Sequence, residues 1–331
     1  MQATYPPHVA TVETMMIWTK LSKQQQDDIV SRAAIGESIW VLAEEYDIKE
    51  SSLERKLRLL RSENPPSEKI FNTSALWLDV NEPKRIFVYS DAHFGMEDRG
   101  ALNAAIKVAE MFQPEIIVNL GDTLDCYSIS KFKKDPGGSS LQSERDAWSA
   151  WATKLNSVCA DDVQRYIIKG NHEARFETFL MENPGIADLD EMSVDSLLMT
   201  DALGYHSVVD AIYVNADRDE LYPNAQLYFL HGSRALKHSG SSTRAASDMY
   251  AGASTIVGHA HRSAMVTQRT GRGISKSYEV GTLASLMPDY MFFPNWSQSI
   301  LTGVIMKDFH EFQLHVIDRG RVCYGGNVIG G

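Results

Sequence analysis

Hydrophobic positions along the chain follow two different periods, one before and one after about residue 70. Over residues 24–61, apolar residues recur every three or four positions, which is typical of amphipathic helices. A break at residues 46–52 separates two such stretches and resembles the turn of a helix-turn-helix, so we expect a further helix over residues 52–61. The segment SENPPSEK (62–69) contains adjacent prolines and predicts a linker.

From about residue 84 the chain carries short runs of β-branched and aromatic residues, each followed by a polar loop that contains glycine. Such runs predict buried strands, here at residues 85–89, 115–120, 165–168, 226–230 and 255–257. Helical patterns over residues 101–112 and 141–159 separate the first three, as in an α/β sheet, and residues 173–203 also look helical. Four runs after residue 276 predict antiparallel strands that complete a second sheet.

The length of 331 residues allows one large catalytic domain and a small appendage. We therefore expect an N-terminal arm, helical unit and linker over residues 1–66 and the catalytic domain over residues 67–331. The three cysteines, at positions 126, 159 and 323, form neither a disulfide framework nor a CxxC zinc pair. The net charge of −11 excludes a protein that coats nucleic acid with its whole surface, although metal ions in a site can still attract phosphates.

No run approaches the roughly 18 apolar residues that a membrane helix needs, and the N-terminus lacks the features of a signal peptide. We therefore expect a cytoplasmic protein without a membrane partner, and the oligomeric state stays open.

Each of the five predicted strands ends within a few residues of a side chain that can bind a metal ion. Open α/β sheets place their sites beyond the carboxyl ends of the strands. Imidazole, carboxylate and amide ligands without thiolate suit manganese, iron or zinc. We expect two divalent ions, manganese first and iron or zinc as alternatives, with the central Asp122 bridging them. The residues are Asp91, His93, Asp122, Asn171, His172, His231, His259 and His261.

Taken singly, each of these residues has a structural alternative, such as a turn aspartate, a helix cap or a core histidine. Their occurrence together, in order and each at the end of a strand, argues against that alternative.

The same segments resemble the five sequence blocks of the calcineurin-like metallophosphoesterases. The blocks are DAH at 91–93, GDTLD at 121–125, GNHE at 170–173, HG at 231–232 and GHAH at 258–261. The resemblance covers about residues 84–325 and implies a four-layer α/β/β/α sandwich with a dinuclear metal site. It also implies that Asp91, His93 and His261 hold the first metal, that Asn171, His231 and His259 hold the second, and that Asp122 bridges both.

Two further residues have roles that only the resemblance implies. His172 matches a histidine that does not bind metal but contacts the phosphate or protonates the leaving group, while a metal-activated hydroxide attacks phosphorus in line. Asp125 matches the carboxylate that orients this histidine in the phosphoprotein phosphatase branch. The alternative for Asp125 is a solvated loop carboxylate.

The sequence departs from the phosphoprotein phosphatase branch at Cys126, where that branch carries a phosphate-binding arginine. Arg175 and Arg234 are candidates to replace it as substrate contacts, and surface arginines are the alternative. Arg234 belongs to the basic, serine-rich segment SRALKHSGSSTR (233–244), which we expect to be a loop near the site. The missing arginine disfavours a protein phosphatase.

The predicted helix over residues 52–61 carries four basic residues and one acidic residue, and a recognition helix would touch DNA with such a face. Arg55, Lys56 and Arg58 are the candidate nucleic-acid contacts. A helical hairpin packed on the catalytic domain, or a protein–protein contact, are the alternatives.

A helix-turn-helix joined to a phosphoesterase favours a phosphodiester in nucleic acid or a nucleotide as substrate. The layout also resembles phosphoesterases of bacteriophages, which would place the protein in the host cytoplasm. Two other functions stay open. One is a phosphomonoesterase acting on a phosphoprotein or small metabolite. The other is a DNA-binding module with a metal-stabilised scaffold, which the intact ligand positions disfavour.

Overall fold

The computed structural model describes residues 21–34, 39–48, 53, 74–131, 134, 137–189, 191–217, 224–271, 273–288 and 294–330. The chain divides into two compact units, Met1–Asn72 and Thr73–Gly331, and each is described by itself. None of the described helices is long and apolar enough to cross a membrane.

The small unit contains two helices, α2 (Lys23–Ala34) and α3 (Ile39–Glu45). Ile29 and Leu42 are fully buried and form the centre of a small core. The Arg32 guanidinium on α2 donates hydrogen bonds to both carboxylate oxygens of Glu45, at 3.0 and 2.7 Å, and so ties the two helices together. The expected helix over 52–61, with Arg55, Lys56 and Arg58, and the linker at 62–69 lie outside the described residues.

The large unit contains two β-sheets. The seven-stranded sheet has the order β13-β12-β11-β10-β2-β3-β4, and the six-stranded sheet has the order β1-β5-β6-β7-β9-β8. The strands of the first sheet are β2 (Lys84–Tyr89), β3 (Ile116–Asn119), β4 (Gln164–Ile167), β10 (Gln298–Met306), β11 (Phe309–Asp318), β12 (Arg321–Tyr324) and β13 (Asn327–Gly330). Those of the second are β1 (Ala75–Leu78), β5 (Ala211–Val214), β6 (Leu227–Leu230), β7 (Ser254–Val257), β8 (Ala264–Thr270) and β9 (Gly273–Glu279).

Alternate residues of each strand face opposite sides of its sheet, and this alternation builds two separate cores. Ile86 and Val88 of β2 face the second sheet, where they meet Phe229 and other apolar side chains of that sheet. Phe87 and Tyr89, between them in the sequence, face the opposite way and pack against helices. A sheet buried on both faces explains why these runs are continuously hydrophobic.

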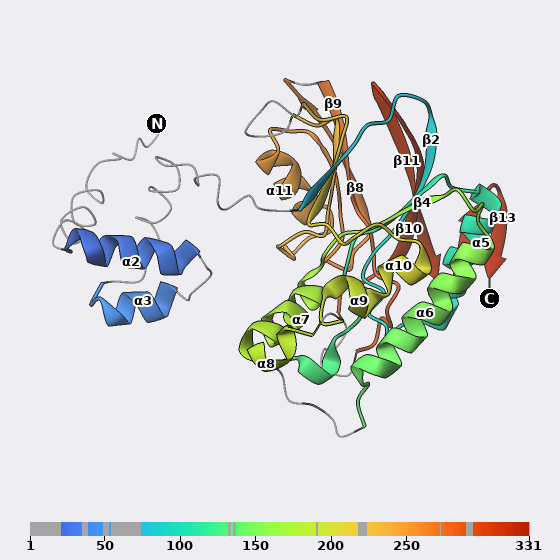
Figure 1. Ribbon diagram of the computed structural model, residues 1–331. Helices are drawn as coiled ribbons and strands as arrows, with labels where there is room; N and C mark the ends of the chain where they lie inside the picture. Colours follow the sequence, from blue (N-terminus) through green and yellow to red (C-terminus); the bar gives the residue numbers. More distant parts are fainter. Residues whose placement is uncertain are drawn as a thin grey trace. The chain divides into compact units, whose positions relative to one another are not determined.

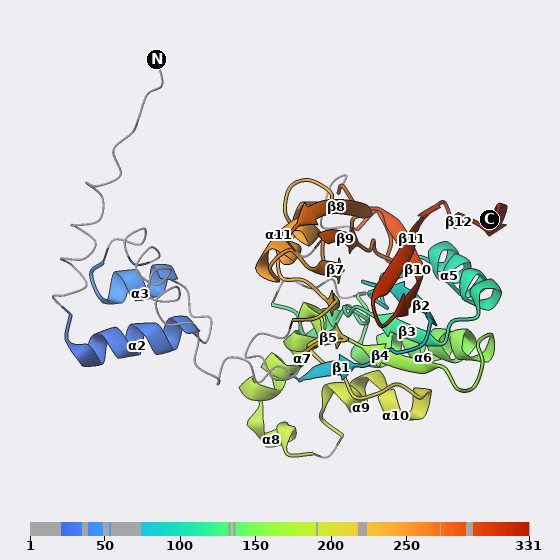
Figure 2. The same cartoon turned by 90° about the horizontal axis from the view of Figure 1, so that it is seen from above.

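Helices cover the outer faces of both sheets, which gives the four layers (Figures 1 and 2). Helices α5 (Arg99–Phe112) and α6 (Leu141–Ser157) pack on the first sheet through Ala105 and Trp148 among others. Helix α11 (Ser241–Met249) lies on the second sheet, where the Thr243 hydroxyl is 3.1 Å from that of Thr255 on β7. The four-layer α/β/β/α prediction is therefore confirmed.

The expected helical segment at 173–203 consists of four short helices beside the first sheet. They are α7 (Asn171–Glu182), α8 (Pro184–Ala187), α9 (Val194–Leu198) and α10 (Thr200–Leu203), and a single 3-10 turn, η2 (Tyr127–Ile129), precedes α6.

Two expectations were wrong in part. The strands at 298–306, 309–318 and 321–324 are antiparallel as expected, but they extend the first sheet beside β2 rather than complete the second. Periodicity identifies a strand but not its partner, and the β2–β10 pairing joins residues far apart in the chain. The segment 233–244 is not a loop throughout, because α11 begins at Ser241, whose preceding loop is fixed by the buried Glu279 carboxylate.

Candidate metal centre

The loops that follow five strands meet at one end of the sandwich. Strands β2, β3 and β4 run parallel, as do β6 and β7, so their carboxyl ends lie at the same edges of the two sheets. Gly121 allows the β3 loop to approach the β4 loop, because a Cβ there would lie 2.6 Å from the backbone nitrogen of Gly170. Gly258 does the same between the two sheets, since its Cβ would lie 2.7 Å from the Asp91 carboxylate.

Most of the proposed ligands have a left-handed backbone conformation. The φ angles of Asp91, His93, Asp122, His259 and His261 are 52°, 44°, 50°, 64° and 54°. Non-glycine residues rarely adopt such angles, because each costs about 1–3 kcal/mol and persists only where the surrounding structure holds it in place. Strain concentrated on residues of one cluster is typical of a functional site.

Asp91, His93 and His261 form one half of the centre. The Nε2 atoms of His93 and His261 face each other at 3.0 Å, and an Asp91 carboxylate oxygen lies 3.2 Å from the latter and 3.9 Å from the former. All three side chains are buried. The backbone N–H of His259 donates to the same carboxylate at 2.9 Å, so the two sheets are joined at this point.

Asn171, His231 and His259 form the other half, with Asp122 between the halves. Asp122 Oδ2 lies 3.2 Å from His231 Nε2 and 3.8 Å from His93 Nε2, so one carboxylate reaches both groups. Asn171 Oδ1 is 3.1 Å from His231 Nε2, and the ligand atoms of Asp122, His231 and His259 lie within 4.8 Å of one another.

The arrangement of these atoms fits metal ions. His231 Nδ1–H donates to the Leu120 carbonyl at 2.8 Å, which leaves the Nε2 lone pair facing oxygens of Asn171 and Asp122. The nitrogens of His93 and His261 converge in the same way. Lone pairs directed at one another repel unless a proton or a cation lies between them, and imidazole with carboxylate and amide oxygen suits divalent metals.

The electrostatic field of the centre also favours cations. Burial opposes the ionised form of Asp122, but the histidines around it outweigh that effect and hold its pKa well below the usual value. Burial alone would lower the pKa of His231, yet Asp122, with Asp91 and Glu173, raises it to about 10. The buried carboxylates thus create a negative potential that draws positive charge into the site.

His172 and Asp125 lie beside the candidate metal ligands, and Arg175 contacts both. Asp125 Oδ1 is 3.2 Å from His172 Nδ1 and 3.4 Å from His93 Nδ1. His172 Nδ1–H donates to the Asp125 carbonyl at 2.7 Å, and Arg175 Nη2 lies 2.8 Å from His172 Nε2. Burial lowers the pKa of His172, but Asp122 and Asp125 together raise it above its usual value.

Unlike Arg175, the side chains of Arg234 and Cys126 form no hydrogen bond with His172 or Asp125 among the described residues. Arg234 is exposed, three residues after His231, and makes no hydrogen bond to the centre in the part of the chain that the structure describes. Cys126 is buried, and burial raises the pKa of its thiol far above the usual value, so the residue supplies no charge where phosphoprotein phosphatases have arginine.

Sequence reasoning missed Glu173, whose carboxylate is fully buried directly beneath the centre. It accepts backbone hydrogen bonds from Gly170 at 2.9 Å, Asp122 at 3.0 Å and Thr123 at 2.7 Å. Glu173 is the third residue of α7 after its Gly170 N-cap, which is the position of a capping-box glutamate. The spacing in GNHE carries that signal, so the residue was detectable from the sequence.

Comparison with known proteins finds a matching family model, two phage relatives and a similar solved structure. Residues 84–277 match the family model of the calcineurin-like phosphoesterases. The Gene 54 proteins of Mycobacterium phages D29 and L5 are 26% and 27% identical over 262 residues, covering 74% of this chain and 98% of each relative. The structure of Vacuolar Protein Sorting 29 from Cryptosporidium parvum matches with a TM-score of 0.40 and 10% identity, over 75% of this chain and 97% of that one.

Proposed function

Because the chain belongs to the calcineurin-like phosphoesterase family, and is therefore a metal-dependent hydrolase of phosphate esters, we propose that it cleaves a phosphodiester in nucleic acid or a nucleotide. The metal chemistry in this proposal is supported by Asp122, whose carboxylate lies between two groups of candidate ligands, and the choice of a nucleic-acid diester is supported by the Trp296 ring beside them. The residues fit two divalent ions, and we propose manganese, because the ligands are nitrogen and oxygen without thiolate.

In this proposal each side chain has a defined task. Asp91, His93 and His261 hold one ion, Asn171, His231 and His259 hold the other, and Asp122 bridges them. Bound metal ions supply Lewis acidity and lower the pKa of water to the physiological range.

His172 protonates the leaving oxygen in this scheme. Its Nδ1–H is held by the Asp125 carbonyl, which directs Nε2 toward the metal side of the site. The Asp125 carboxylate at 3.2 Å supports the protonated ring. The Arg175 guanidinium, which can only donate, lies 2.8 Å from Nε2, so in this scheme it turns to a phosphate oxygen when Nε2 takes up the proton that it transfers. Arg234 is exposed and has no hydrogen bond to the centre among the described residues, so in this scheme it contacts a part of the substrate beyond the phosphate.

Two observations support a diester of nucleic acid. The neutral Cys126 thiol removes one cation from the phosphate side of the site, and a diester carries one negative charge where a monoester carries up to two. The half-buried Trp296 ring stands 4.3 Å from the His261 ring, in edge-on contact, beside the metal ligands. An aromatic ring at that position can stack on a nucleobase.

The second candidate is a phosphomonoesterase acting on a phosphoprotein or small metabolite. Arg175 favours it, because a guanidinium next to His172 can bind two oxygens of a terminal phosphate. The two functions differ in the charge and size of the group beyond phosphorus, so substrate comparison separates them.

The test compares turnover of bis-(p-nitrophenyl) phosphate, p-nitrophenyl phosphate, and labelled single- and double-stranded DNA with manganese present. The proposal expects the diester and DNA to be cleaved faster than the monoester. Turnover of the monoester alone would contradict it. Repeating the assay with iron and zinc tests the choice of metal.

We further propose that the N-terminal helices bring DNA to the site through Arg55, Lys56 and Arg58, which lie outside the described residues. The phage relatives support a role in the cytoplasm of an infected host cell. The deletion described in the Discussion tests the DNA contact.

A further inference from the structure

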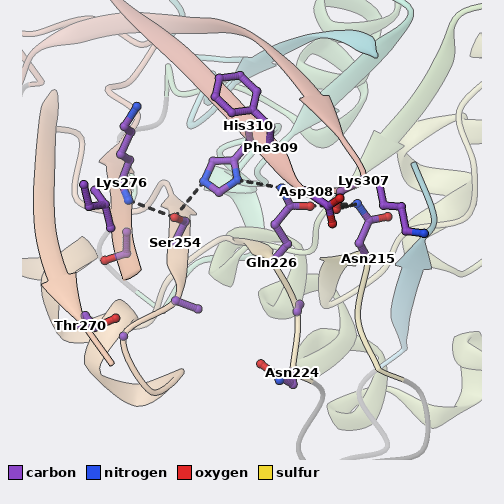
Figure 3. Close-up of a pocket in the computed structure, with 15 residues that line it drawn as sticks. Asn215, Asn224, Gln226, Ser254, Thr270, Lys276, Lys307, Asp308, Phe309 and His310 are labelled. Carbon is purple, nitrogen blue, oxygen red and sulfur yellow. Dashed lines mark hydrogen bonds between the residues drawn. The ribbon is translucent and has the colours of Figure 1, made fainter. Parts of the chain in front are cut away.

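A pocket lies at the end of the sandwich opposite the candidate metal centre. It has a volume of about 680 Å³ and is formed where β6 and β7 begin, whereas the metal ligands follow the ends of the same strands. The turn between β10 and β11 closes one side (Figure 3). This volume is within the range of about 300–1,000 Å³ that small-molecule sites occupy.

A chain of hydrogen bonds runs along this pocket. Its first member is a backbone N–H, which can only donate, and this fixes which atom donates in each of the bonds that follow. The Val80 N–H donates to Asn215 Oδ1 at 2.7 Å, which identifies that atom as the amide oxygen. The Asn215 amide nitrogen then donates to Gln226 Oε1 at 2.9 Å. Gln226 therefore presents its own NH₂ group to the next residue, as Figure 3 shows.

The next residue is His310, and its tautomer follows. Gln226 Nε2 donates to His310 Nδ1 at 3.3 Å, so the proton of the neutral ring must be on Nε2. Burial first, and then Lys276, lowers the pKa of His310 to about 4, so the ring is neutral near pH 7. Nε2–H donates to Ser254 Oγ at 2.9 Å. Histidine thus acts here as a donor, which excludes a role as the base of a serine nucleophile.

The chain ends in a hydroxyl that must donate. Ser254 Oγ already accepts from His310 and from the backbone N–H of Lys276 at 3.0 Å, so both of its acceptor positions are occupied. Its proton has no acceptor among the described residues. Ser275, which also lines the pocket, is 4% exposed, and its hydroxyl has no hydrogen-bond partner within the described part of the chain.

Charge and apolar surface complete the pocket. Lys307 and Asp308 both line it, and neither has an ion-pair partner among the described residues, whereas Lys276 is paired with Glu311. The pocket therefore offers one ammonium and one carboxylate beside the two serine hydroxyls, and the hydroxyls, not the net charge, favour an acceptor. Phe309 and Ile274, which are 51% and 68% exposed, give the pocket an apolar wall. Buried donors without acceptors are costly, and a ligand that accepts from them gains that free energy.

We propose that this pocket binds a small organic oxyanion, a phosphonate, phosphate or carboxylate on an apolar or aromatic body. The hydroxyls of Ser254 and Ser275 donate to its oxygens, Lys307 balances its charge, and Phe309 with Ile274 covers the body. The site is separate from the metal centre and does not depend on the substrate proposed above.

Isothermal titration of the metal-loaded full chain with phenylphosphonate tests this site. We expect the metal centre to bind phosphonates as well, and inhibition of ester hydrolysis measures that event independently. Wild type should show two binding events. Ser254→Ala and Ser275→Ala should each weaken only the second, about tenfold, because each removes one hydrogen bond to a charged group. Benzoate and benzyl alcohol, titrated in parallel, distinguish carboxylate from phosphonate and both from a neutral body.

Several results would overturn the proposal. They are a single binding event in wild type, unchanged affinity in both variants, or benzyl alcohol binding as tightly as the anions. Ser277→Ala is the matched control, since this buried hydroxyl on β9 already accepts from the Thr255 N–H. That variant should leave both events unchanged. ¹⁵N NMR of His310 should show the Nε2–H tautomer, and an Nδ1–H tautomer would reverse the chain of hydrogen bonds and contradict the argument.

Discussion

Glu173→Gln changes one atom of a buried carboxylate that accepts hydrogen bonds from backbone N–H groups, and we expect it to weaken metal binding. The carboxylate is fully buried and accepts three backbone hydrogen bonds, one of them from the Asp122 N–H. Glutamine has the same shape but carries an NH₂ group in place of one oxygen. If the glutamine oxygen still accepts the hydrogen bonds from the N–H groups of Asp122 and Gly170, its NH₂ group faces the N–H of Thr123. Two donors then point at each other.

The structure sets the size of the effect. A hydrogen bond to a charged group contributes about 1.5–3 kcal/mol, and an unsatisfied buried N–H costs about 1–3 kcal/mol. Against this, burial first, and then Asp122, raises the pKa of Glu173, so a neutral amide avoids part of the cost of burying its charge. We expect a net loss of about 2 kcal/mol in the free energy of unfolding. Residues that orient metal ligands typically change metal affinity by about 10–100-fold when mutated.

The assay is a manganese titration of Glu173→Gln followed by urea unfolding of the metal-free protein. Glu177→Gln, one turn further along α7, is the matched control. Glu177 is 38% exposed and pairs with Lys169, so it should change neither quantity measurably. If Glu173→Gln keeps wild-type metal affinity and stability, Glu173 does not position Asp122 and the reasoning fails.

Three other predictions concern the candidate site, the N-terminal segment and the pocket residue His310. Asp122→Ala should lose metal and turnover together, whereas His172→Ala should keep metal and lose turnover by about 10²–10⁴-fold; equal metal loss in both would make His172 a ligand. Deleting residues 1–66 should weaken DNA binding and flatten its salt dependence while sparing hydrolysis of p-nitrophenyl esters, and unchanged affinity would remove the helices from recognition. Burial lowers the pKa of His310 to about 4, so the unfolded chain binds the extra proton between about pH 6.5 and 4. The free energy of unfolding should therefore decrease, by at most about 3 kcal/mol, as the pH is lowered from about 6.5 to 4. In His310→Gln, the free energy of urea unfolding should depend less on pH across that range.

The parts of the fold that the sequence predicted are those with a local signal. Continuous apolar runs placed β2, β3, β4, β6 and β7 within one or two residues, because these strands are buried on both faces. The amphipathic pattern did the same for α5 and α6. Strand β8 alternates between half-buried and exposed residues and went unnoticed, as did the four-residue strands β1, β5 and β13.

The features of the fold and site that the sequence did not predict depend on contacts between residues far apart in the chain. The assignment of β10 to the first sheet depends on its pairing with β2, about 200 residues earlier, for which the sequence carries no local signal. The residues of the candidate metal centre could be selected from the sequence because each follows a predicted strand, and their role as ligands stays a prediction. The Thr282 hydroxyl donates to the Asp91 carbonyl at 2.5 Å and so supports the loop that carries Asp91. The sequence did not predict this contact, because no pattern distinguishes a buried supporting hydroxyl from one on the surface.

The central claim is that two groups of ligands joined by Asp122 bind two metal ions that hydrolysis requires. Its most direct test is titration of the metal-free protein with manganese while turnover of bis-(p-nitrophenyl) phosphate is followed. We expect two ions to bind per chain and turnover to appear only as the second is filled. Full turnover in the presence of a chelator, or saturation of activity with one ion per chain, would contradict it.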